Sequence, residues 1–132
     1  MRVVLDSHAI IWYVQGSARL SRTAATTITD AEQAGELVVS VATFLDLWYV
    51  TQTTKAVTAE QLRSLRDRLE SSGTVTIEPV NLAVADAWQG IPRAVLADPW
   101  DRLIVATAIA LQVPLVSKDE AIQASGLVTV VW

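Results

Sequence analysis

The 132-residue chain has the length of one domain, with room for a single hydrophobic core. Hydrophobic residues make up 52% of it and charged residues 18%, a composition that excludes a disordered tail. The net charge of −4 argues against a general nucleic-acid coat protein, because affinity for phosphates comes from lysine and arginine. The absence of cysteine excludes disulfides and thiolate metal sites. No N-terminal signal pattern is present, and no apolar run approaches the ~20 residues that span a bilayer, so we expect a cytoplasmic protein without membrane contact.

Short apolar runs alternate with helical patterns in the first half of the chain. The predicted elements are a strand at 2–5, helices at 8–14 and 22–34, a strand at 37–39 and a helix from 41 to about 52. Ser7 is expected to cap the first of these helices, and Gly16 to end it.

The second half repeats the alternation. A capping box at Thr58 begins a helix that Gly73 ends, and the remaining predicted elements are a strand at 74–77, helices at 82–89 and 99–111, a strand ending at 116, a short helix after Asp119 and a strand at 127–131. Strands that alternate with helices favour a parallel sheet with right-handed crossovers. We therefore predict one α/β domain over residues 1–132, a three-layer α/β/α sandwich around a mainly parallel five-stranded sheet.

The helix at 99–111 begins with two carboxylates. Asp98 suits the N-cap, Pro99 the first helical position and Asp101 the third position of the helix. Taken alone, these residues need no role beyond starting a buried helix.

Three other acids lie where they can join this pair. Asp6 follows the first predicted strand and Asp119 follows the fourth, so both lie at the carboxyl edge of the sheet, where open parallel sheets bind ligands. Asp46 lies on an otherwise apolar helix surface, where an ionised carboxylate is costly unless it is paired or binds a metal. The alternative, an edge position that reaches solvent, remains open for Asp46.

If these elements pack together, Asp6, Asp46, Asp101 and Asp119 face one small cavity. Like charges so close are unfavourable unless a cation neutralises them, and oxygen ligands favour Mg²⁺ or Mn²⁺. Such an ion can activate a water and stabilise a phosphodiester during its displacement. Zinc is poorly supported, because His8 is the only imidazole.

The residues alone leave three classes of function open. The first is a metal-dependent RNA hydrolase, and the second is a binding module with a weakened site that acts through partner capture. The third is a phosphoacceptor or phosphatase domain. The sequence argues against it, because the residue two positions after Asp6 is His8 rather than a second acid.

The segments 4–12, 40–47, 98–108 and 117–119 together resemble the PIN domain, and more narrowly the VapC toxins of type II toxin–antitoxin pairs. The resemblance covers nearly the whole chain. It implies a metal-dependent endoribonuclease that cleaves RNA with Mg²⁺, or with Mn²⁺ as a substitute, and that a cognate VapB-like antitoxin holds inactive. It also implies a homodimer.

The resemblance assigns roles to individual residues. The four acids in order are Asp6, Asp46, Asp101 and Asp119, with Asp98 as an accessory acid for which capping is our preferred role. Small hydroxyl residues stand beside the acids and are expected to hold water or a carboxylate; they are Ser40 and Ser117. The second acid is usually glutamate, so Asp46 is one methylene short and is expected to bind a metal weakly or through water.

Side chains near the acids suggest contacts with RNA and with the antitoxin. His8 is read as a neighbour or RNA contact, and a local basic rim is expected from Arg19, Arg93, Arg102 and Lys118. We expect an antitoxin tail to bring Arg or Lys into the acidic pocket. Its helix would lie in a groove formed by Ile11, Trp12 and Trp48, against the alternative that these side chains belong to the core.

Overall fold

The computed structural model describes residues 1–132, the whole of the printed sequence. Its elements in chain order are β1 (Val3–Leu5), α1 (Ser7–Gln15), α2 (Arg22–Gln33), β2 (Leu37–Ser40), α3 (Val41–Thr53), α4 (Ala59–Ser71), β3 (Val75–Glu78), α5 (Leu82–Gln89), α6 (Pro99–Leu111), β4 (Leu115–Val116), α7 (Glu120–Ser125) and β5 (Val130–Val131). None of the helices combines the length and apolar character needed to cross a membrane.

The five strands form one sheet in the order β3-β2-β1-β4-β5. Every neighbouring pair is parallel, so the prediction of a mainly parallel sheet is confirmed and extends to all four pairings. Strand β1 lies in the middle, and its residues Val4 and Leu5 pair with Leu115 and Val116 of β4.

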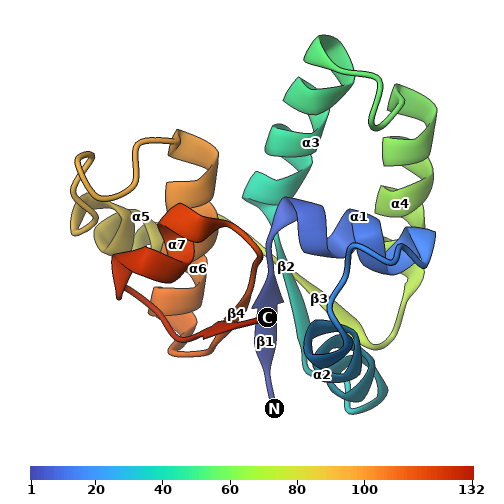
Figure 1. Cartoon of the computed structure of the whole chain (residues 1–132), viewed down its shortest axis with the longest axis horizontal. Coiled ribbons are helices and arrows are strands. Elements are labelled where there is room, and N and C mark those ends of the chain that lie inside the picture. Colours follow the sequence, from blue (N-terminus) through green and yellow to red (C-terminus); the bar gives the residue numbers. More distant parts are fainter.

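Helices cover both faces of this sheet, as the predicted three layers require (Figure 1). Because side chains alternate along a strand, Val3 and Leu5 pack on one face with the cluster that includes residues of α1, α2 and α4. Val4 points to the opposite face and packs with residues of α5, α6 and α7. Helix α3 contributes Leu47 to the first cluster and Ala42 to the second, and it rises above the sheet in Figure 1.

The carboxyl ends of the three central strands meet above the middle of the sheet. Asp6 follows β1, Ser40 ends β2 and Ser117 follows β4, and all three are buried. The strand order reverses its direction between β1 and β4, which is where open α/β sheets bind their ligands. The topology therefore points to the position beside Asp6 as the place for a site.

Three local predictions were wrong. The N-cap of α1 is Asp6 rather than Ser7, because the extended backbone of Asp6 lets its side chain accept from the Ala9 N–H. Helix α4 ends at Ser71, before Gly73. The last strand keeps only Val130–Val131 of the predicted 127–131, because it pairs only with the two-residue β4.

Candidate functional site

Asp6 lies at the centre of the candidate site. Its Oδ1 accepts a hydrogen bond from the Ala9 N–H at 2.8 Å, and the residue is only 6% exposed. Burial raises the pKa of the Asp6 carboxyl, and the negative charge of Asp119 raises it further, while the Ser117 hydroxyl, the Ala9 N–H and His8 lower it. Asp6 is thus a buried carboxylate with one oxygen committed to starting α1.

Asp98 and Asp119 repeat this arrangement. Asp98 Oδ1 accepts from the N–H groups of Trp100 and Asp101, both at 2.9 Å, and caps α6 as predicted. Asp119 Oδ1 accepts from the Ile122 N–H at 2.9 Å and caps α7. In each cap the bonds go to Oδ1, so the Oδ2 atom makes none of these contacts.

Asp46 is held from the neighbouring helix. The Ser7 hydroxyl of α1 donates to Asp46 Oδ2 at 2.6 Å across 39 residues of sequence. Burial raises the pKa of the Asp46 carboxyl and the Asp98 charge adds to this, whereas the Ser7 hydrogen bond and His8 lower it. This role of Ser7 had no separate signal in the sequence, because a serine after a strand equally suits a helix cap.

Asp101 is influenced by all the other acids of the site. Burial, followed by the carboxylates of Asp98, Asp119, Asp46 and Asp6, raises the pKa of Asp101 to about 7. The two salt bridges of the protein lie elsewhere, between the Met1 amino group and Glu36 and between Arg66 and Glu70. No Lys or Arg side chain therefore forms a salt bridge with this group of carboxylates.

The two predicted hydroxyl positions differ in their contacts. Ser117 Oγ accepts from the Asp119 N–H at 3.0 Å and lies beside Asp6. Ser40 Oγ accepts from the Ala42 N–H at 3.0 Å and from the Thr107 hydroxyl at 3.3 Å, so it caps α3 and joins it to α6. Thr107 was not singled out from the sequence, where it looks like any small residue of an apolar helix.

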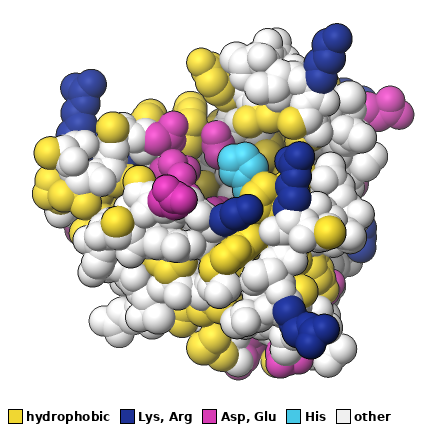
Figure 2. Space-filling view, in the orientation of Figure 1, with side chains coloured by type: hydrophobic (Ala, Val, Ile, Leu, Met, Phe, Trp, Pro, Cys, Tyr) yellow, Lys and Arg dark blue, Asp and Glu magenta, His cyan; other side chains and the backbone are white.

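The acids border a hollow on the surface (Figure 2). Figure 2 shows Asp and Glu side chains gathered beside the single histidine, with Lys and Arg side chains on the other side of it. One cavity of about 270 Å³ is lined by Asp6, Asp119 and three residues that face them, His8, Trp12 and Lys118.

The chemistry of these groups suits a hard divalent cation, because the acids offer only carboxylate oxygens. No group of three or more His, Asp or Glu side chains lies close enough together in this structure to hold an ion. The donor set therefore fits Mg²⁺ or Mn²⁺ by its chemistry, and binding requires the carboxylates to move closer together.

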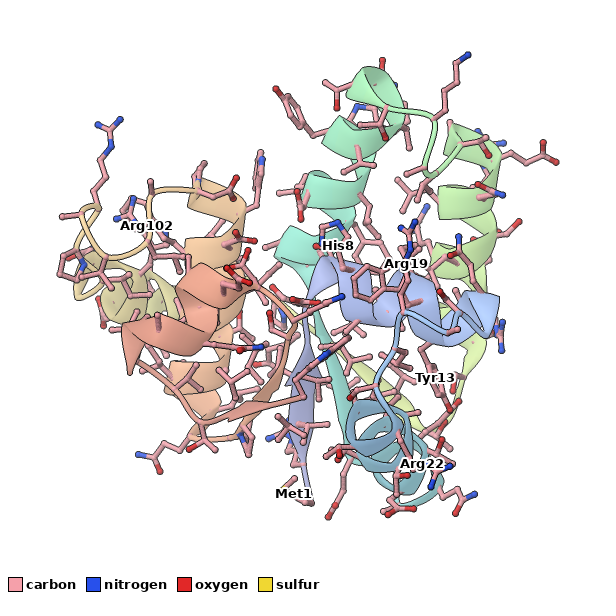
Figure 3. All side chains as sticks on the ribbon, viewed as in Figure 1. Met1, His8, Tyr13, Arg19, Arg22 and Arg102 are labelled. Carbon is pink, nitrogen blue, oxygen red and sulfur yellow. The ribbon has the colours of Figure 1, made fainter.

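The predicted basic rim is formed only in part. Lys118 lines the cavity beside Asp6, and Arg19 lines an adjoining hollow of about 410 Å³ that also contains Asp46. Arg93 is exposed on the α5–α6 connection. Arg102 was assigned wrongly, because its guanidinium lies 4.1 Å from the ring centroid of Trp88 and its Nη2 donates to the Ile91 carbonyl at 3.2 Å, away from His8 (Figure 3).

Comparisons with known proteins agree with this architecture. The family model of the PIN domain matches residues 3–125. Ribonuclease VapC22 of Mycobacterium tuberculosis (strain ATCC 25618 / H37Rv) is 36% identical over 122 residues, which cover 92% of this chain and 89% of that protein. Among solved structures, VapBC2 from Rickettsia felis bound to a DNA fragment from its promoter has a TM-score of 0.70 at 16% identity and covers 98% of this chain and 97% of that one. DNA-bound VapBC from Salmonella typhimurium has a TM-score of 0.68 at 15% identity and covers 98% and 96%.

Proposed function

The chain belongs to the PIN domain family, and from this premise we propose that it is a VapC-like ribonuclease toxin that cleaves RNA phosphodiester bonds with the help of Mg²⁺. The observation that carries the proposal is the group of carboxylates that form no salt bridge, in which burial and four acids raise the pKa of Asp101 to about 7. Such a concentration of negative charge costs stability, and a divalent ion is the simplest partner for it.

We assign the metal ligands to Asp6, Asp101 and Asp119, with Asp46 as a fourth ligand, directly or through water. When bound, Mg²⁺ lowers the pKa of a coordinated water and stabilises the charge that develops on the phosphate. Asp98 keeps the helix start in place, and Ser117 supports Asp6. Mn²⁺ is expected to substitute, because it accepts the same oxygen ligands.

We propose a VapB-like antitoxin as the protein partner, since solved structures of the same fold include VapBC complexes. The place proposed for an apolar helix face is a groove of about 330 Å³ between α1 and α4, which the half-buried Ile11 and Val14 line above the buried Val57 and Leu65. Trp12 lines the adjoining hollow, whereas Trp48 lines neither the groove nor the hollow. The groove therefore lies closer to α4 than the sequence predicted.

We assign Trp48 to a homodimer contact instead. Leu45, Trp48 and Tyr49 lie on one side of α3 and are 48%, 52% and 58% exposed. Three large apolar side chains at this helical spacing form a face suited to a second copy of the chain. Trp48→Glu is expected to convert a dimer into a monomer in light scattering, and an unchanged mass for this variant would remove α3 from the interface.

The test of the enzymatic proposal is cleavage of single-stranded RNA. Wild-type protein is expected to cleave in millimolar Mg²⁺ and to stop on addition of EDTA. Asp6→Asn is expected to lose at least roughly 100-fold in rate, because it removes a ligand charge at the centre of the site. The matched control is Asp86→Asn, which changes an exposed acid of α5 far from these contacts. Cleavage that survives both EDTA and Asp6→Asn contradicts the proposal.

One observation favours a second candidate, a weakened PIN-fold binding module that acts through partner capture. The carboxylates do not form a metal-holding group in this structure, and Asp46 is one methylene shorter than glutamate. This candidate predicts tight binding of the antitoxin by a protein without metal-dependent cleavage. The absence of cleavage in the same assay would distinguish it from the ribonuclease.

A further inference from the structure

The cavity beside Asp6 has a second wall that the metal proposal does not use. This space of about 270 Å³ is lined by Asp6 and Asp119 and also by His8, Trp12 and Lys118, the three residues that make up the second wall. The volume is slightly below the roughly 300 Å³ at which pockets for drug-sized ligands begin. It has room for a ligand the size of a single nucleotide.

The second wall combines aromatic rings with a cation. His8 and Trp12 are one helical turn apart on α1, with ring centroids at 5.4 Å and planes tilted by 40°. Trp132 also packs against Trp12 in a T-shaped arrangement, with ring centroids 5.8 Å apart. The Lys118 ammonium lies over the Trp12 ring, 5.8 Å from its centroid.

Lys118 has no carboxylate partner, although Asp119 is its neighbour in sequence. Neither salt bridge of the protein includes it, and its side chain is exposed. An ammonium group held only over an aromatic ring in an accessible cavity is available for an anionic ligand. Because the protein has a net charge of −4, the positive charge of Lys118 beside the acids reduces the electrostatic repulsion of an approaching phosphate.

We infer that this cavity is a subsite for one nucleotide of single-stranded RNA, whose base stacks on Trp12 and His8 and whose phosphate contacts Lys118. The inference rests on the proposed ribonuclease function and deepens it. Base stacking suits a protein that has few cations, because it supplies affinity without phosphate contacts and tolerates any base. The base must be unpaired to reach the ring, so the subsite selects single strands over duplex RNA.

Lys118 then has two positions. In the free protein its ammonium stays over the Trp12 ring, and in the complex it moves to the phosphate while the base takes its place on the ring. Trp132 packs against Trp12 in a T-shaped arrangement, and this contact keeps the ring in position in both states.

The test measures binding separately from cleavage. The probe is a fluorescein-labelled 2′-O-methyl hexa-adenylate, which lacks the free 2′-hydroxyl, and its Kd is measured by fluorescence anisotropy in Mg²⁺. Trp12→Leu is expected to weaken binding roughly tenfold, since a base–aromatic stack typically contributes that much or more. Trp12→Phe retains an aromatic ring and is expected to stay within about threefold of wild type. Equal affinity of the Leu and Phe variants overturns the stacking assignment.

The salt dependence tests Lys118 independently. Lys118→Gln is expected to lower the slope of log Kd against log salt by about one, because one phosphate contact is lost. The control Lys55→Gln changes an exposed lysine beyond α3 and is expected to leave the slope unchanged. An unchanged slope in Lys118→Gln overturns the phosphate contact. If Trp12→Leu does not fold by circular dichroism, His8→Ala replaces it, because it removes the exposed second ring of the stack. Wild-type affinity of His8→Ala then overturns the stacking assignment.

Failure of the subsite and failure of the proposed function give different results. If wild-type protein cleaves RNA while Trp12→Leu and Trp12→Phe show the same KM, the subsite is wrong and the ribonuclease stands. If wild-type protein does not cleave RNA in Mg²⁺, the proposed function is wrong, and the anisotropy measurements still report whether the cavity binds a nucleotide.

Discussion

The hydroxyl of Ser7 donates a hydrogen bond of 2.6 Å to the carboxylate of Asp46, joining the first residue of α1 to the second turn of α3. Ser7 is only 4% exposed, so solvent does not compete freely for this bond. The bond fixes an acid whose side chain is short for its place in the family pattern. Ser7 is thereby a positioning residue for Asp46, the proposed second acid of the site.

Ser7→Ala is expected to lower kcat roughly tenfold with little change in KM, because Asp46 loses its orientation while the nucleotide contacts remain. Asp46→Glu, which adds the missing methylene, is expected to restore part of the activity in the Ser7→Ala background. Steady-state cleavage kinetics measure both effects, with the exposed Ser71→Ala as the control. Equal kcat values for Ser7→Ala and Ser71→Ala would refute the positioning role.

The stability of the metal-free protein is expected to decrease as the pH rises from about 4 to about 7. In the folded state the pKa of Asp101 is raised from 3.8 to about 7, so between these values the native protein holds a proton that the unfolded chain has released. The free energy of unfolding therefore falls with pH across this window. Buried Asp6 and Asp46 act in the same direction.

Asp101→Asn removes the contribution of the raised Asp101 pKa and is expected to make the pH dependence shallower, with the contributions of Asp6 and Asp46 remaining. Urea unfolding at several pH values in EDTA measures it, and Asp86→Asn serves as the control for loss of an exposed acid. A wild-type stability that increases steadily from pH 4 to pH 7 contradicts the raised pKa.

Mg²⁺ is expected to raise the melting temperature, because the folded site binds the ion and the unfolded chain does not. At saturating millimolar metal the gain is about 1–3 kcal/mol, or roughly 2–10 °C for a domain of this size. Because the ion must displace the proton of Asp101, its apparent affinity is expected to fall as the pH drops below about 7. Thermal unfolding with and without metal at pH 6 and pH 8 checks both parts, and curves that metal leaves unchanged at both pH values count against a formed site.

Arg102 is expected to act on stability and loop order rather than on RNA binding. Its guanidinium contacts the Trp88 ring and the Ile91 carbonyl, and it thereby ties the connection that leads to Asp98 onto α5. Arg102→Ala is expected to cost about 1–3 kcal/mol of unfolding free energy, whereas Arg93→Ala on the same exposed connection costs little. Chemical denaturation of the two variants decides this; similar stabilities contradict the anchoring role.

The sequence predicted those parts of the site that depend on local rules. The N-cap at Asp98 and the place of Asp101 follow from three adjacent residues, and the carboxyl-edge positions of Asp6 and Asp119 follow from strand alternation. The central strands are short and mostly apolar, so the sandwich of three layers could also be predicted.

Contacts between distant elements could not be predicted in the same way. The partner of Ser7 is 39 residues away, and it became visible only once α1 and α3 were packed together. The direction of the Arg102 side chain depends on Trp88, whose position is set by the packing of α5 on α6. The exposure of Trp48 likewise depends on which side of α3 the sheet covers, a choice that an apolar helix pattern leaves open.

A crystal structure of the protein soaked in Mn²⁺ tests the central claim most directly, because the anomalous signal of the ion locates it without assumptions. The account predicts an ion whose oxygen ligands, at about 2.1–2.2 Å, include Asp6, Asp101 and Asp119, with Asp46 bound directly or through a water. An ion that binds elsewhere, or carboxylates that stay apart at saturating Mn²⁺, contradicts it.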